Sequence, residues 1–287
     1  MRNFILLISI AAGILFPYGH QFTFLIRYFL MVMLYFSFLD IRMEKSVIKK
    51  IHFVILLTII FSPLLFYSVT KFFDGYLAEA VFITSFSPTA IAAPVIISLK
   101  KGKVEFVIFS LLLSNIVISL LTPFMLPLIV HTSKNISVGV VLFPVLFTIS
   151  IPMVLAQATK FLLPKIWKKF IAWKDLTFYI LVLNIYLAVS DATMYIRAEL
   201  TSKFLIVTLI AVSSAMLCIL YFYLGKIIGG NEYGAEASQS LGQKNNAFTL
   251  WISLTFIGPL AALGPIFYVL FQNIYITWQL SNHRKNL

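Results

Sequence analysis

Long apolar runs separated by short polar loops dominate the hydrophobic pattern of the chain. Each run approaches or exceeds the length of about 20 residues that a helix needs to cross a bilayer. The pattern therefore predicts an all-α polytopic membrane protein with ten transmembrane helices. The expected spans cover residues 4–19, 22–39, 51–70, 77–99, 104–130, 137–163, 176–195, 204–228, 235–257 and 260–280.

A polar stretch at residues 238–246 interrupts this pattern. The apolar run that follows it, residues 247–280, would be about 50 Å long as one helix, against a hydrocarbon core of about 30 Å. We expect Gly258-Pro259 and Gly264-Pro265 to divide this run into a hairpin. Its first part is then only half a crossing, unless the polar stretch supplies the other half.

We therefore predict that residues 235–257 cross the membrane and carry Lys244, Asn245 and Asn246 near mid-depth. Such residues normally face a protein-lined cavity and mark a substrate or ion path. The alternative is that the polar stretch is a cytoplasmic loop, which leaves nine spans and an over-long final segment.

Composition supports a membrane protein, because 61% of the residues are hydrophobic and 11% are charged. Most of the 22 basic residues fall in loops expected on one side, so they determine topology and do not indicate nucleic-acid binding. The positive-inside rule then places both termini in the cytoplasm. We expect the membrane to be a bacterial inner (plasma) membrane. Four scattered histidines and the single cysteine, Cys218, predict no metal site, no cofactor and no enzymatic activity.

Ten spans also predict an inverted repeat of five plus five, since an odd number of spans per half inverts the second half. The first repeat would cover residues 1–131 and the second residues 132–287. Spans 4 and 9 then correspond, and both contain helix breakers: Pro88 and Pro94 in span 4, Gly242 in span 9. Paired broken helices are typical of the substrate site of a secondary transporter.

Short motifs in spans 4, 5, 9 and 10 follow one another in a defined order. They read SPTA at residues 87–90 and LKKGKV at 99–104, LTP at 121–123, LGQKNN at 241–246, LAALGP at 260–265 and FQNI at 271–274. In order and spacing they resemble the bile acid:sodium symporter family of ten-span secondary transporters. The resemblance implies that spans 4 and 9 cross at their breaks within a core of spans 3–5 and 8–10. This core would move against a panel of spans 1, 2, 6 and 7.

The resemblance also locates the family's two sodium sites. Its ligand positions fall here on Thr58, Ala93, Pro94, Leu111, Asn115, Ser240, Gln243 and Lys244. Half of these eight residues lack the side-chain oxygen that a hard cation requires, the family's anionic ligand is absent, and a lysine stands among them. One hypothesis is that Lys244 replaces a sodium ion and can load and release a proton. The alternative is that Lys244 is a permanent counter-charge to a helix C-terminus or a carboxylate.

The substrate site is expected at the crossing of spans 4 and 9. Its predicted residues are Thr89, Asn245, Asn246, Gln272 and Asn273, although Gln272 and Asn273 could instead only link helices. We predict a secondary active transporter that moves a small organic anion, bile-acid-like or a carboxylate, by alternating access with weakened or absent sodium coupling. The expected partners are this anion, a proton or sodium ion, and the lipid bilayer. The alternatives are an ordinary sodium-coupled symporter, a non-transporting membrane sensor or an intramembrane enzyme.

Three further charged residues lie in or beside these spans. Arg27, about two turns into span 2, is expected to extend toward the interface, with attraction of an anion as the alternative. Glu232 and Glu236, beside span 9, are expected to be solvated, although either could pair with Lys244.

Overall fold

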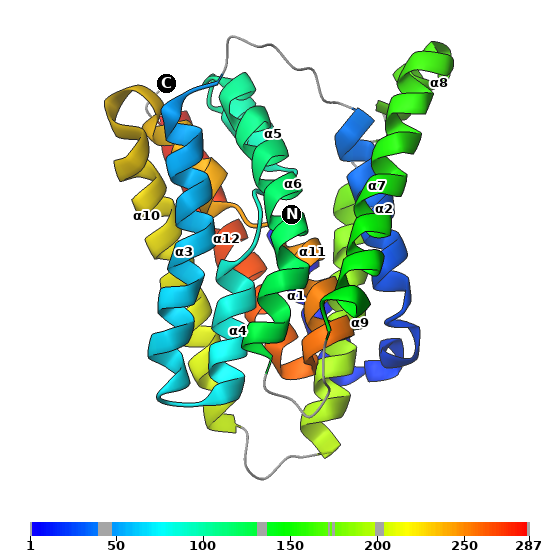
Figure 1. The fold of residues 1–287 in the computed structure, drawn as a ribbon, viewed down its shortest axis with the longest axis vertical. Helices are drawn as coiled ribbons and strands as arrows, with labels where there is room; N and C mark the ends of the chain where they lie inside the picture. The colour runs from blue at the N-terminus through cyan, green and yellow to red at the C-terminus, as the bar shows by residue number, and fades with distance from the viewer. Residues whose placement is uncertain are drawn as a thin grey trace.

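The computed structural model describes residues 2–39, 48–130, 137–171, 173, 176–198 and 204–285, and these residues are almost entirely helical (Figure 1). The elements are α1 (Arg2–Leu15), η1 (Pro17–Phe22), α2 (Leu25–Leu39), α3 (Lys50–Lys71), α4 (Gly75–Ser85), α5 (Ala93–Leu99), α6 (Val104–Ile129), α7 (Val138–Leu162), α8 (Pro164–Ile171), α9 (Leu176–Ala198), α10 (Phe204–Gly242), α11 (Asn246–Ile252), the π-helical η3 (Ser253–Ile257) and α12 (Pro259–Lys285).

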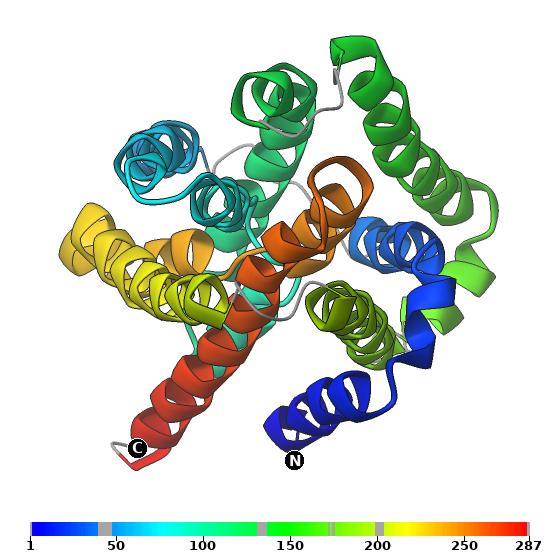
Figure 2. The same cartoon turned by 90° about the horizontal axis from the view of Figure 1, so that it is seen from below.

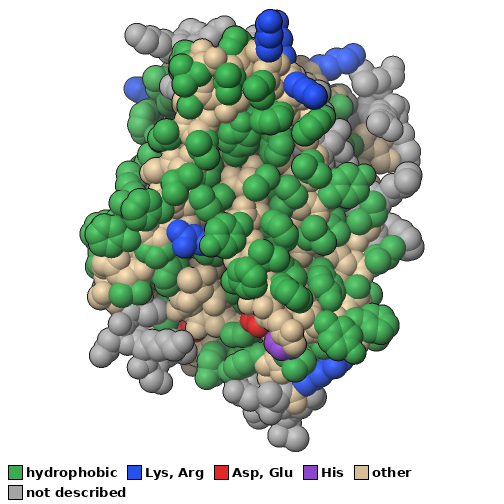
Figure 3. Space-filling view, turned by 90° about the vertical axis from the view of Figure 1, so that its right-hand side faces the viewer, with side chains coloured by type: hydrophobic (Ala, Val, Ile, Leu, Met, Phe, Trp, Pro, Cys, Tyr) green, Lys and Arg blue, Asp and Glu red, His purple; other side chains and the backbone are tan. Residues whose placement is uncertain are grey.

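Six helices in the described part of the chain are long and apolar enough to cross a membrane. Their outer faces are apolar: on α3, for example, Phe53, Leu57, Phe61 and Leu65 recur every four residues and are all exposed. Figure 3 shows hydrophobic side chains over most of one face of the molecule. Exposed apolar surface of this extent would be unfavourable in water. The molecule is therefore an all-α membrane protein.

Helix α10 is a hairpin rather than one straight helix. The hydroxyl of Ser238 donates to the carbonyl oxygen of Phe222 at 2.7 Å, although 16 residues separate them. In a straight helix these residues would lie about 24 Å apart. The backbone turns between Gly230, whose φ of 57° suits glycine, and Tyr233. This turn lies between the expected spans 204–228 and 235–257.

The two Gly-Pro pairs behave differently. Gly258 has a φ of 155° and separates η3 from α12, so this pair turns the chain as predicted. Pro265 lies inside α12, so the expectation that Gly264-Pro265 also divides the run is wrong. A proline can remain within a helix when neighbouring groups satisfy the freed carbonyl.

The helices pack in two groups (Figure 2). In one group, α2 contacts α7 and α9, and α9 contacts α1. The other set of contacts links α3, α4, α5, α6, α10, α11 and α12. The groups meet where α7 packs on α6, α9 on α12 and α2 on α11. These contacts do not test the predicted panel and core or the repeat, whose boundary at residues 131–132 lies outside the described residues.

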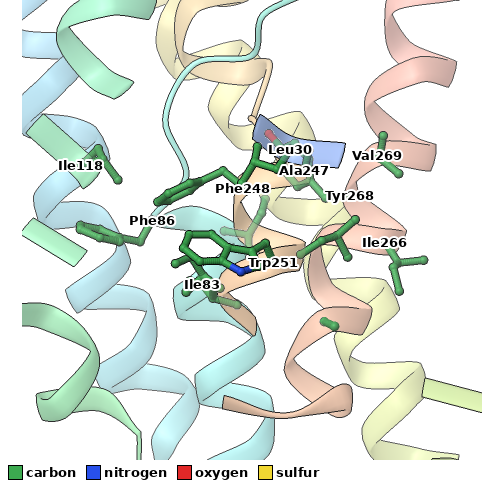
Figure 4. Close-up of a cluster of buried hydrophobic side chains, with 14 of the residues drawn as sticks. Leu30, Ile83, Phe86, Ile118, Ala247, Phe248, Trp251, Ile266, Tyr268 and Val269 are labelled. Atoms are coloured by element: carbon green, nitrogen blue, oxygen red, sulfur yellow. The ribbon is translucent and has the colours of Figure 1, made fainter. Parts of the chain in front are cut away.

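The short helices α4 and α11 lie at the centre of these contacts. Every residue from Leu77 to Ser85 and from Asn246 to Ile252 is buried. Figure 4 shows apolar side chains packed around them, with Phe86, Phe248 and Trp251 close together and Leu30 of α2 beside Ala247. Helices α4 and α11, which each border a helix break, are therefore buried over nearly their whole length.

Candidate functional site

Two interrupted helices meet at the centre of the bundle. Residues 86–92 separate α4 from α5, and residues 243–245 separate the end of α10 from α11. The two breaks pair as a short antiparallel bridge between Thr89 and Lys244. The Ala90 N–H donates to the Gln243 carbonyl, and the Asn245 N–H donates to the Pro88 carbonyl, both at 2.8 Å. Each break thus satisfies backbone groups that the other exposes.

Pro88 and Gly242 lie where the sequence predicts the breaks. Pro88 is within the first break, whereas Gly242 is the last residue of α10 and packs directly against the Phe222 ring. Pro94 does not break a helix. It lies in the first turn of α5, where the missing N–H of proline has no helical acceptor to lose. Pro94 therefore starts the second half of the helix, and its assignment as a break is corrected.

Lys244 is the charged group at the crossing, with only 1% of its surface exposed. Its ammonium nitrogen donates to the carbonyl of Ser85 at 3.1 Å and to that of Ser87 at 3.5 Å. It also lies 3.8 Å from the ring centroid of Tyr221, a cation–π arrangement. Since Ser85 ends α4, the ammonium occupies the negative end of that helix dipole.

The nearby glutamates have other partners. Glu236 accepts the Lys103 backbone N–H at 2.8 Å, and Glu232 forms an ion pair with the Lys103 ammonium at 3.4 Å. No carboxylate of the described residues pairs with Lys244. Of the two counter-charge partners considered for Lys244, the helix C-terminus is the one that the contacts favour.

Amide side chains connect the crossing to the neighbouring helices. Asn115 of α6 donates to the Thr89 carbonyl at 3.0 Å and accepts from the Asn245 amide at 3.1 Å. Gln272 of α12 accepts the Lys244 backbone N–H at 2.8 Å and lies 3.5 Å from the Asn246 amide nitrogen. All these side chains are buried. Four predicted substrate residues, Thr89, Asn245, Asn246 and Gln272, are therefore together in one cluster.

Two buried oxygen atoms, one in the last turn of α10 and one in the second break, lack a hydrogen-bond partner among the described residues: Ser240 Oγ and Gln243 Oε1. The Gln243 amide nitrogen donates to Gln239, whose own amide donates to Gln279 of α12 at 2.7 Å. Buried polar groups are usually satisfied, so unpaired oxygens of this kind are candidates to bind a ligand or water.

Other predicted residues lie apart from this cluster. Asn273 donates to the Val269 carbonyl within α12, and Thr58 donates to the Val54 carbonyl within α3. Ala93 begins α5, and Leu111 contributes only a backbone carbonyl, which accepts from Asn115. The structure therefore does not bring the side chains of Asn273 and Thr58 to the crossing.

Sequence reasoning missed several groups at the site. Tyr221 carries the ring below the Lys244 ammonium, and its hydroxyl lies 2.7 Å from Ser62 Oγ. Ser114 Oγ accepts the Thr89 N–H at 3.0 Å. Nothing distinguishes Tyr221 in a chain with 13 tyrosines, whereas Gln239 and Gln279, as amides within apolar runs, could have been found.

Comparisons with known proteins add no identification, because no family model and no curated protein matches the chain. The resemblance to bile acid:sodium symporters stays a prediction from short motifs. Within the described residues, no group of three or more His, Cys, Asp or Glu side chains is arranged to hold a metal ion.

Proposed function

We propose that the protein is a secondary active transporter for a small organic anion, with the crossing of the two breaks as its substrate site. The observation that carries this proposal is the Thr89–Lys244 bridge between two interrupted, deeply buried helices. In secondary transporters, discontinuous helices of this kind place backbone and polar groups around a substrate without exposing them to lipid.

The proposal includes ten crossings, in which α4 with α5, and the end of α10 with α11, each form one interrupted span. The ten spans would form two inverted repeats of five, with both termini in the cytoplasm of a bacterial cell. Movement of the core against the α1, α2, α7 and α9 group would open the buried crossing to each side in turn.

An anionic substrate fits the charges at this site. The crossing holds the Lys244 ammonium and several amides, and none of its contacts involves a carboxylate. Amides can donate to an anion without adding a charge of their own. A cationic substrate would find no opposite charge among these groups.

Lys244 would replace a sodium ion. Its ammonium uses the Ser85 and Ser87 carbonyls, the kind of oxygen ligands that a hard cation requires. A sodium ion about 4 Å from the ammonium would be repelled by roughly 4 kcal/mol at an effective dielectric constant near 20. The proposed transporter therefore has weakened or absent sodium coupling.

The experiment is to measure the thermal stability of the purified protein with a panel of organic anions, in sodium or choline buffer at two pH values. We expect at least one carboxylate to raise the melting temperature equally in both salts. Stabilisation that requires sodium would indicate an ordinary symporter instead. If none of the anions has an effect, the proposed function is wrong.

Transport into proteoliposomes tests the role of Lys244. We expect Lys244→Ala to abolish uptake or to change its pH dependence, while Lys71→Ala, which removes an exposed lysine, leaves both unchanged. Uptake by Lys244→Ala with the pH dependence of the wild type would refute the replacement of sodium by Lys244.

A further inference from the structure

Arg27 of α2 is held between three helices and does not extend freely toward an interface. Its Nε donates to the hydroxyl of Thr148 in α7 at 2.9 Å. Its guanidinium carbon lies 5.9 Å from the centroid of the Trp251 ring in α11. The side chain is half-buried. It therefore occupies the place where the α1, α2, α7 and α9 group meets the second broken helix.

This position is close to the crossing. Leu30, three residues after Arg27 and so on the same face of α2, lies beside Ala247 at the start of α11 (Figure 4). Trp251 is five residues after Asn246, which corresponds to roughly 8 Å along the helix. The ring that the guanidinium contacts is thus attached about one and a half helical turns from Asn246.

The charge of Arg27 is not neutralised within the described part of the chain. No carboxylate there forms an ion pair with it, and the contact with Thr148 uses one of its five N–H donors. A guanidinium with free donors matches the two oxygens of a carboxylate in a bidentate pair. The Thr148 and Trp251 contacts fix its orientation and so reduce the entropy lost on binding.

Lys244 favours an anion through its charge, but its ammonium already contacts two carbonyls and a ring face, so it is less suited to direct hydrogen bonds with a carboxylate. Arg27, which lies between the two helix groups, is therefore the better candidate in the described part of the chain for direct contact with a carboxylate.

We propose that Arg27 binds the carboxylate of the transported anion, while the Asn246 and Gln272 amides bind an uncharged polar group of the same molecule. This inference rests on the proposed transport function and specifies its substrate class. The substrate is a short organic carboxylate with a second polar group, since Asn246 and the residue whose ring Arg27 contacts are about one and a half turns apart on α11.

The test is calorimetric or thermal-shift titration of the wild type, Arg27→Gln and Arg197→Gln with a carboxylate that stabilises the wild type and with its primary amide. Arg197 is a matched control, since it is an exposed arginine at the end of α9 that donates to the Ile14 carbonyl at 2.6 Å. Arg27→Gln is expected to weaken carboxylate binding about 10- to 100-fold and to leave amide binding unchanged. Arg197→Gln is expected to change neither.

The outcomes separate this inference from the proposed function. If no organic anion binds the wild type, both are wrong. Equal carboxylate affinities for the wild type and Arg27→Gln would overturn only the role of Arg27. If Arg27→Gln does not purify as a folded protein, Arg27→Lys takes its place. Lysine keeps the charge but lacks the planar pair of N–H donors, so we expect several-fold weaker carboxylate binding. An unchanged affinity in that variant would also overturn the inference.

Discussion

The two helix breaks meet as a pair but contribute different chemistry. The first break, residues 86–92, and the end of α4 before it offer mainly backbone. The carbonyls of Ser85 and Ser87 face the lysine, and that of Pro88 accepts from the second break. The second break, residues 243–245, offers side chains: the Lys244 ammonium and the Asn245 amide. The backbone pairing runs in both directions, since the Ala90 N–H also donates to the Gln243 carbonyl, but the charged side chain comes from the second break alone.

This difference explains how a lysine can be buried here. Carbonyls at the end of α4 concentrate negative partial charge, and burial would leave them unsatisfied without a donor. Lys244 satisfies them from within the chain. If a bound ion had this role instead of Lys244, the carbonyls would be satisfied only while the ion is present.

The breaks are also held in place differently. The helix before the first break packs closely on α12, because a Cβ on Gly264 would lie 2.8 Å from the Ala80 carbonyl oxygen and would also meet Thr84. The second break is held by hydrogen bonds to α12, from Tyr268 to the Gly242 carbonyl at 2.7 Å and from the Lys244 N–H to Gln272. Steric changes should therefore damage the first break, and loss of polar groups should damage the second.

Gly264→Val should have the largest effect, because it forces the backbone of α4 away from α12. We expect a loss of about 3 kcal/mol of stability, measured as a lower thermal midpoint in detergent. Gly139→Val is the control, since nothing lies within 4 Å of a Cβ at Gly139. Equal midpoints for the two variants would mean that packing at Gly264 does not hold the first break.

Lys244→Met should have the second-largest effect on stability. The substitution keeps an unbranched side chain but leaves the carbonyls of Ser85 and Ser87 without their charged donor. The expected loss is about 2 kcal/mol. Lys71→Met, at an exposed position on α3, should change stability by less than about 0.5 kcal/mol. A Lys244→Met protein as stable as the wild type would show that these carbonyls need no cation.

Asn245→Ala should cost about 1–2 kcal/mol, since Asn245 caps α11 by accepting the Phe248 N–H and also donates to Asn115. Asn273→Ala provides the matched comparison, because Asn273 bonds only within its own helix among the contacts described for its side chain. Thermal midpoints of the two variants should differ clearly. If they coincide, the amide network does not hold the second break.

Local chemistry made the breaks predictable from sequence. Pro88 cannot donate a backbone hydrogen bond, and a lysine with two asparagines does not belong on a lipid-facing helix. These facts concern a few neighbouring residues, so they indicate a break near Pro88 and another near Lys244 without knowledge of the fold. The bounds 86–92 and 243–245, and the position of Pro94 inside α5, come only from the structure.

The partners of these residues were not predictable in the same way. That Tyr221 lies beside Lys244, or that Asn115 rather than Asn273 reaches the crossing, depends on the rotation of whole helices. Such rotations follow from packing between distant segments. Neighbours in sequence, such as Gln272 and Asn273, consequently differ in role although both are amides in the same apolar run.

Thr89→Val should have the smallest effect, and it tests whether the first break contributes any side chain to the second. Thr89 Oγ1 donates to the Ser240 carbonyl at 2.6 Å, while its backbone makes the bridge to Lys244. Valine keeps the shape and the backbone pairing but removes this donor, so the expected loss is about 1 kcal/mol. Thr58→Val removes a hydroxyl that bonds only to the Val54 carbonyl of its own helix and should be close to neutral. A Thr89→Val protein with the thermal midpoint of Thr58→Val would mean that the first break acts through its backbone alone, and the contrast between the two breaks would then be sharper than the contacts indicate.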